Sequence, residues 1–163
     1  LDIPPPWIGP PRARQLALPL LASYQALLAT PLLGEATLRS GPAFVRGLIR
    51  FASGPRATWD EQQLDVYARP LMEPARARAS CACYRTFLTR ELPELVRERG
   101  SKRAAELRVP ALLLMGERSA IDRTLDPQPA GQLHVRRIPG AGHFLPEEAP
   151  HAVLDAAEEW FAG

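Results

Sequence analysis

Residues 140–150 read GAGHFLPEEAP and place His143 on a turn flanked by glycine. The preceding residues 133–138, LHVRRI, predict a short strand, and an amphipathic helix is predicted from about Pro150 to Phe161. An imidazole on such a turn can reach into a cleft and exchange protons near neutral pH. His143 is therefore a candidate catalytic residue, although a histidine between Gly and Phe could also simply hydrogen-bond the turn.

A second apolar run, VPALLLMGER at 109–118, ends its hydrophobic part at a glycine. Such a run is typical of a buried parallel strand. We predict that 109–115 and 133–138 are neighbouring parallel strands joined by a short helical crossover near 120–131. Against these strands the terminal helix should bury five apolar side chains, those of Val153, Leu154, Ala157, Trp160 and Phe161.

The region from about 12 to 100 is predicted to be helical, with breaks at Pro and Gly. Arg14–Ala29 carries leucines at helical spacing, and a long helix is expected to begin near Pro74. Thr58 and Glu61 have the spacing of a capping box. The predicted organisation is a strand exit with a Pro-rich linker at 1–11, a helical cap at 12–105 and a part of an α/β core at 106–163.

The strand, the glycine turn, His143 and the terminal helix resemble the last strand–helix unit of α/β-hydrolases, where the turn histidine is the catalytic base. The run at 109–115 resembles the family's penultimate strand, whose following loop carries the acid partner of the histidine. The family pattern has an aspartate where this sequence has Ser119. Asp122 is our first candidate for the acid, because a carboxylate fixes the imidazole tautomer and stabilises the imidazolium. Asp126 and a carboxylate from outside the chain are the alternatives.

No Gly-x-Ser-x-Gly or Gly-x-Asp-x-Gly nucleophile elbow and no His-Gly-Gly oxyanion segment occur in the sequence. The resemblance therefore implies a partial α/β-hydrolase fold: a helical cap followed by two parallel strands and a C-terminal helix. We expect the N-terminal half of the hydrolase core to be missing. Without it the chain alone should have no hydrolase activity.

Two cap tyrosines indicate a type of reaction. Tyr24-Gln25, followed by PLLGE at 31–35, resembles the tyrosine-glutamine helix of epoxide hydrolases, and Tyr84-Arg85 resembles their later tyrosine-arginine pair. Two phenol donors can stabilise the oxygen of an opening epoxide. Each tyrosine alone could instead be an interfacial aromatic with its hydroxyl in water.

The resemblance thus implies an epoxide hydrolase, in which an aspartate of the missing elbow forms an ester that His143-activated water hydrolyses. One alternative is a serine esterase or acyl hydrolase, in which His143 deprotonates a serine and the tyrosines only line the pocket. The other alternative is a degenerate, non-catalytic fold that acts as an interaction module.

Composition and charge are those of an ordinary globular protein, with 163 residues, 46% hydrophobic residues and a net charge of +2. No apolar run approaches the roughly 20 residues of a membrane span. Glutamates are interspersed among the arginine clusters, which favours a solvated surface over nucleic-acid binding.

Cys81 and Cys83 lie two positions apart on a predicted helix, so they face different sides of it and cannot pair. We expect both to be small buried residues in a cytoplasmic protein. The expected ligand is an apolar small-molecule substrate, and no cofactor, metal, nucleic acid or membrane partner is predicted.

Overall fold

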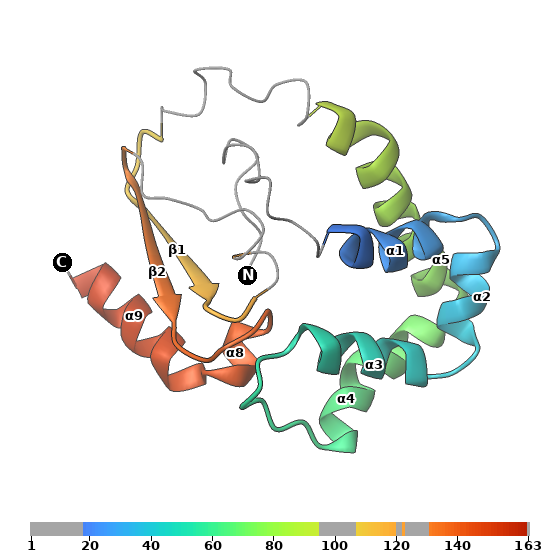
Figure 1. The fold of residues 1–163 in the computed structure, drawn as a ribbon, viewed down its shortest axis with the longest axis horizontal. Helices are drawn as coiled ribbons and strands as arrows, with labels where there is room; N and C mark the ends of the chain where they lie inside the picture. Colours follow the sequence, from blue (N-terminus) through green and yellow to red (C-terminus); the bar gives the residue numbers. More distant parts are fainter. Residues whose placement is uncertain (1–17, 95–106, 120–121, 123–130, 163) are drawn as a thin grey trace. The chain divides into compact units, whose positions relative to one another are not determined.

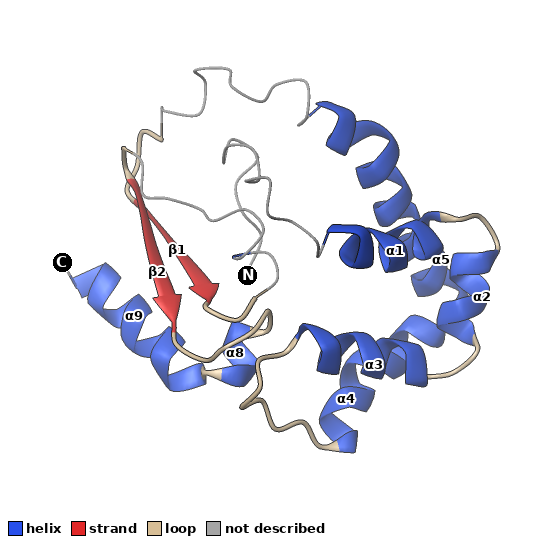
Figure 2. Cartoon of the chain, in the orientation of Figure 1, coloured by secondary structure: helices blue, strands red, loops and turns tan. Residues whose placement is uncertain are grey.

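The computed structural model describes residues 18–94, 107–119, 122 and 131–162. Figures 1 and 2 show its elements, which are α1 (Leu18–Ala29), α2 (Leu33–Arg39), α3 (Ala43–Ala52), α4 (Glu61–Ala68), the 3-10 helix η1 (Arg69–Met72), α5 (Pro74–Thr86), the π-helix η2 (Phe87–Glu91), β1 (Ala111–Gly116), β2 (Leu133–Ile138), α8 (Leu145–Glu148) and α9 (Pro150–Ala162). The long helix predicted to begin near Pro74 is confirmed as α5, where proline is tolerated because the first helical N–H needs no partner.

The described residues form two compact units. The helical unit takes in the described parts of Leu16–Phe51 and Trp59–Glu98, and the strand unit takes in Ala52–Thr58 and the described parts of Arg99–Gly163. The sequence prediction assigned Ala52–Thr58 to the cap, whereas its contacts group it with the strands. The predicted crossover lies outside the described residues except for Asp122.

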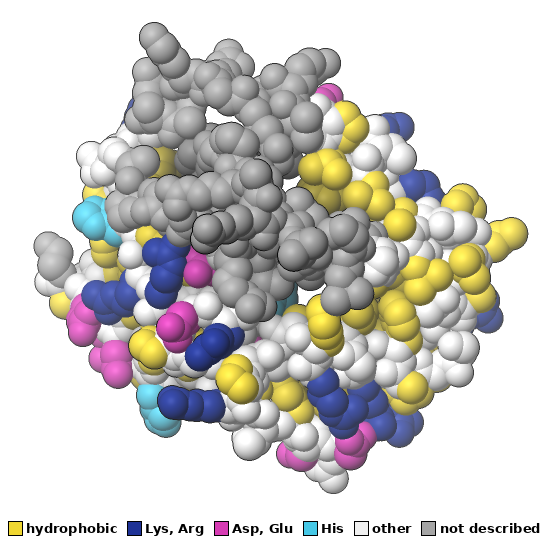
Figure 3. Space-filling model, viewed as in Figure 1, with side chains coloured by type: hydrophobic (Ala, Val, Ile, Leu, Met, Phe, Trp, Pro, Cys, Tyr) yellow, Lys and Arg dark blue, Asp and Glu magenta, His cyan; other side chains and the backbone are white. Residues whose placement is uncertain are grey.

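The helical unit is built around side chains that its helices bury completely or nearly so, namely Leu28, Leu38, Val45, Ile49, Leu64, Ala68, Ala77 and Cys81. Cys81 is fully buried as predicted, and burial raises the pKa of its thiol. The prediction for Cys83 was wrong, because this cysteine is exposed on the opposite side of α5. Figure 3 shows further hydrophobic side chains gathered over the visible face of this unit.

The capping box of α4 lies two residues later than predicted. Asp60, not Thr58, is the N-cap: its carboxylate accepts from the backbone N–H of Gln63, and the Gln63 side chain accepts from the Asp60 N–H. Both patterns have the required spacing. Asp60 has the extended backbone that a cap needs, so the helix begins at Glu61.

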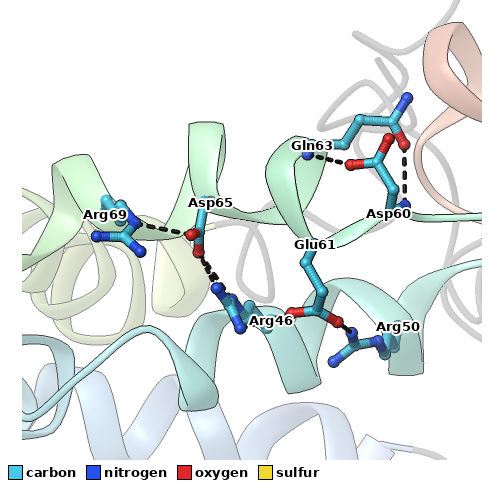
Figure 4. Close-up of polar contacts among 7 residues, drawn as sticks. All are labelled: Arg46, Arg50, Asp60, Glu61, Gln63, Asp65 and Arg69. Carbon is cyan, nitrogen blue, oxygen red and sulfur yellow. Dashed lines mark hydrogen bonds and ion pairs between the residues drawn. The ribbon is translucent and has the colours of Figure 1, made fainter.

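Charged side chains join α3 to α4 across the surface of the helical unit (Figure 4). Arg46 of α3 bonds to Asp65 and Glu61 of α4, and Arg69 bonds to the second oxygen of Asp65 at 2.7 Å. These hydrogen bonds from Arg46 and Arg69 lower the pKa of Asp65. Arg50 adds a contact to Glu61 one turn further along α3.

The two strands pair in parallel, as predicted, with Ala111 opposite Leu133 and Gly116 opposite Ile138. Alternation along the strands separates two faces. One face carries a cluster of Leu113, Met115 and Leu133, and the other packs Ile138 against α8 and α9.

Helix α9 lies along this second face of β2, as its contacts and Figure 1 show. Arg136 forms an ion pair with Glu159 at 2.6 Å, and the rings of His134 and Trp160 are 5.1 Å apart. Ala152, Val153 and Ala156 form the packed stripe of the helix, with Ala149 just before it.

The predicted burial of two α9 side chains was wrong. Leu154 is 54% exposed and Phe161 is 85% exposed. These two residues lie seven apart on one helix face, and the stripe that packs on the strands lies on a different face. No helix of the described residues is long and apolar enough to cross a membrane.

Candidate active site

The strand unit contains two predicted site residues, each of which follows one of its strands in the sequence. Because β1 and β2 are parallel, their carboxyl ends lie at the same edge of the sheet. Asp122 follows β1, and His143 follows β2 after a turn at Pro139–Gly142. Catalytic side chains of open α/β sheets are found at this edge.

Every backbone N–H from Gly140 to Phe144 has a hydrogen-bond acceptor. Gly140 donates to Glu117 Oε2 at 3.0 Å, and Ala141 donates to the Ile138 carbonyl at 3.4 Å. Gly142 and Phe144 donate to the two oxygens of Glu148 at 2.7 and 3.0 Å. His143 itself donates to the Ala52 carbonyl at 2.9 Å. The histidine therefore sits on a backbone whose donors are all satisfied, which favours one conformation of the turn.

Three glycines allow three chain segments to meet at this turn. A Cβ on Gly116, at the end of β1, would lie 1.9 Å from the Gly142 carbonyl oxygen. A Cβ on Gly142 would lie 2.2 Å from the nitrogen of Gly54, and one on Gly54 would lie 2.4 Å from the Gly140 oxygen. Gly140 has φ 76°, a conformation that favours glycine. Glycine is needed here because backbone packs directly against backbone.

Asp122 is buried and bonded to the neighbouring strand. Its oxygens accept from Nε of Arg137, on β2, at 2.9 and 3.1 Å. Ser119, where the family pattern has an aspartate, is fully buried, and its N–H donates to the Gly116 carbonyl at 2.9 Å. A bond between Asp122 and His143 therefore stays a prediction, and Arg137 is a partner of Asp122 that the sequence alone did not indicate.

The helical unit brings the two predicted tyrosines together. The rings of Tyr24, on α1, and Tyr84, on α5, meet edge to face with centroids 5.9 Å apart. Burial, with a smaller effect of Tyr24, raises the pKa of Tyr84 to about 12. Gln25 donates to the Tyr24 hydroxyl at 3.4 Å, and Arg85 donates to the Ala29 carbonyl at 3.0 Å, which ties α5 to α1. Tyr84 thus remains a phenol, the form that donates a hydrogen bond, throughout the neutral range.

The tyrosine pair belongs to the helical unit, and Asp122 and His143 belong to the strand unit. Each unit is described by itself, so the convergence of all four residues stays a prediction. Among the described residues, no group of three or more His, Cys, Asp or Glu side chains could hold a metal ion.

Solved structures share this arrangement of helices and strands. A protein of Nostoc sp. PCC 7120 described as an alpha/beta hydrolase, ALR0039, superimposes with a TM-score of 0.71 at 24% identity over 92% of this chain. The epoxide hydrolase CorEH, solved without ligand, gives a TM-score of 0.67 at 20% identity over 95% of the chain. The chain has an α/β-hydrolase fold. A Salmonella enterica protein described as an acyltransferase also matches, with a TM-score of 0.69 at 21% identity over 93% of the chain.

The chain spans about half the length of the proteins it matches, namely 52% of ALR0039, 55% of CorEH and 50% of the Salmonella protein. No protein-family model matches the sequence, and the comparison with curated proteins gives no match either.

Sequence reasoning missed two residues at the turn. Glu148 follows His143 by five positions within the quoted motif, and its spacing allows a carboxylate to fold back on the turn. Gly54 is 88 positions before Gly142, so no local signal could connect them.

Proposed function

We propose that this chain is the C-terminal half of an epoxide-hydrolase-like enzyme. The tyrosine pair carries this proposal, because two adjacent phenols on different helices are the donors that an opening epoxide requires. The likeness to CorEH supports it at the level of the fold. The satisfied backbone of the turn gives His143 the fixed position that a catalytic base requires.

In the proposed reaction, a carboxylate on the elbow of the N-terminal half attacks one epoxide carbon. The carbon–oxygen bond breaks, and Tyr24 and Tyr84 hydrogen-bond the oxygen, which takes a proton from one of the two phenols. His143 then removes a proton from water, and the resulting hydroxide attacks the ester carbonyl. The ester carbon–oxygen bond breaks, the leaving oxygen takes the proton from His143 to complete the diol, and the proton lost when the carboxylate is regenerated restores the phenol. Asp122 orients the imidazole in this scheme, and its hydrogen bond from Arg137 Nε holds the carboxylate beside β2.

The proposed partner of the chain is the N-terminal half of the hydrolase core. In the described residues β1 pairs with β2, and the proposal places a strand of the N-terminal half on the second edge of β1. A strand added there would continue the sheet and bring the elbow to the edge that carries His143. The chain by itself lacks the nucleophile and should not turn over substrate.

An acyl hydrolase is the second candidate, favoured by the likeness to a protein described as an acyltransferase. The third candidate is a non-catalytic interaction module. The serine at position 119 and the hydrogen bond between Asp122 and Arg137 favour it, because both depart from the arrangement of the acid that the α/β-hydrolase pattern implies.

The test uses the complete protein, with both halves of the core. Epoxide and ester turnover are measured for Tyr24→Phe, Tyr84→Phe and His143→Ala. Tyr67→Phe, at an exposed tyrosine of the same unit, serves as the control. We expect each cap variant to lose about 100-fold or more in epoxide turnover, as removal of one oxyanion donor does in other enzymes.

Unchanged epoxide turnover in Tyr24→Phe and Tyr84→Phe, together with robust ester hydrolysis, would replace the proposed epoxide hydrolase with the acyl hydrolase. Absence of both activities in the wild-type complete protein would favour the non-catalytic module, and activity that survives in His143→Ala would reject His143 as the catalytic base. Turnover by the 163-residue chain alone that His143→Ala abolishes would reject the need for an N-terminal half.

A further inference from the structure

The carboxylate of Glu148 collects three backbone donors from two segments of the strand unit. Oε2 accepts from Gly54 and Gly142, both at 2.7 Å, and Oε1 accepts from Phe144 at 3.0 Å. Glu148 is only partly exposed to water, and bonds from N–H groups to an ionised carboxylate are stronger than bonds between neutral groups. The side chain thus links a segment 94 residues away to the turn.

The three contacts surround His143 without involving it. Glu148 binds the amides on either side of the histidine, and the His143 N–H bonds to the Ala52 carbonyl, two residues before Gly54. The peptide group before His143 is held by the bond from the His143 N–H to Ala52, and the one after it by the bond from the Phe144 N–H to Glu148. Two fixed peptide groups restrict φ and ψ of His143, and these angles in turn restrict its side-chain rotamers.

We propose that Glu148 is a positioning residue that sets the direction of the His143 imidazole. The inference rests on the proposed function for its catalytic meaning, since a catalytic base needs a single ring direction. The proposal itself states that Glu148 fixes the backbone of the turn and thereby the rotamer of His143. It can therefore be tested without turnover.

The amide contacts already distinguish Glu148 from its neighbour on α8. Glu147 is exposed, whereas Glu148 is partly buried and its side chain reaches back to the amides of Gly142 and Phe144. Replacement of Glu148 by Gln keeps the shape of the side chain but turns one accepting oxygen into an NH₂ donor. A single remaining oxygen cannot serve the donors on both sides of His143.

The experiment compares the wild-type chain with Glu148→Gln by NMR, with Glu158→Gln as control at an exposed position of α9. In the wild type, the amides of Gly54, Gly142 and Phe144 should be protected from solvent exchange, and the Hα–Hβ couplings of His143 should report one rotamer. In Glu148→Gln at least one of these amides should exchange about tenfold faster or more, and the His143 couplings should average. The control should match the wild type.

A role in stability alone predicts a lower urea midpoint with the His143 rotamer unchanged, and that result would overturn the proposal. Unprotected amides in the wild type would overturn it as well, even if the variant fails to fold. Failure of the epoxide chemistry is a separate outcome: a fixed His143 without epoxide turnover in the complete protein rejects only the proposed function.

Discussion

Gly116→Ala tests directly whether β1 and the histidine turn pack backbone against backbone. The added Cβ would lie 1.9 Å from the Gly142 oxygen and 2.6 Å from the Ala141 oxygen. Because real Cβ atoms essentially never approach such atoms within 3.0 Å, the turn must move by about 1 Å. That movement strains the bond from the Arg118 N–H to the Ala141 carbonyl, now 2.9 Å long.

The cost follows from two effects. Overpacking of a tight site costs about 1–3 kcal/mol, and one hydrogen bond contributes about 1 kcal/mol, so we expect a loss of roughly 2–4 kcal/mol in the free energy of unfolding. With a urea dependence of about 2 kcal/mol/M, the middle of the usual range, the midpoint should fall by about 1–2 M. In the complete protein, displacement of His143 by about 1 Å should lower turnover on the order of 100-fold.

The assay is urea unfolding followed by the fluorescence of Trp160, which lies in the strand unit, after Trp7 and Trp59 are replaced by Phe. Gly47→Ala is the matched control, because an added Cβ at this exposed position of α3 meets nothing within 4 Å. It should stabilise the helical unit by roughly 0.5–1 kcal/mol through helix propensity. A Gly116→Ala midpoint equal to that of the wild type would refute the close packing of the turn.

Two further predictions follow from the helical unit. In a spectrophotometric titration, one tyrosine should ionise at about pH 12, and Tyr84→Phe should remove this transition. The phenol of the unfolded chain ionises near its ordinary pKa of about 10. The free energy of unfolding should therefore fall as the pH rises from about 10 to about 12. An unshifted last phenol transition would contradict the buried tyrosine pair. The pKa of Asp65 is lowered by Arg46 and Arg69, so its contribution to stability is present above the ordinary aspartate pKa of about 3.9 and is lost as the pH falls below it. Urea midpoints against pH should therefore show a smaller acid-side decline for Asp65→Asn than for the wild type, and parallel curves would exclude the role of the α3–α4 network.

Local patterns in the sequence were sufficient for the elements and their direction. The apolar run of β1 and the segment of β2 predicted neighbouring parallel strands, and Pro74 predicted the start of α5, because period, length and proline geometry act over a few residues. The turn and its histidine were also predicted from local residues. These features led to the α/β-hydrolase fold.

Tertiary packing decided what local patterns leave open. Two capping boxes of equal spacing competed at α4, and the backbone conformation of Asp60 selected one. Leu154 and Phe161 are as apolar as Val153, yet only Val153 lies on the face of α9 that meets the strands.

The contacts at the turn depended on tertiary structure most strongly. The pairing of Asp122 with Arg137 and the binding of Gly54 by Glu148 join residues 15 and 94 positions apart. A periodic sequence pattern cannot predict contacts between residues so far apart in the sequence, because these contacts form only when the strands bring separate segments to one edge of the sheet. The sequence by itself therefore predicted His143 as the base, and the folded chain decided which groups hold the backbone around that residue in place.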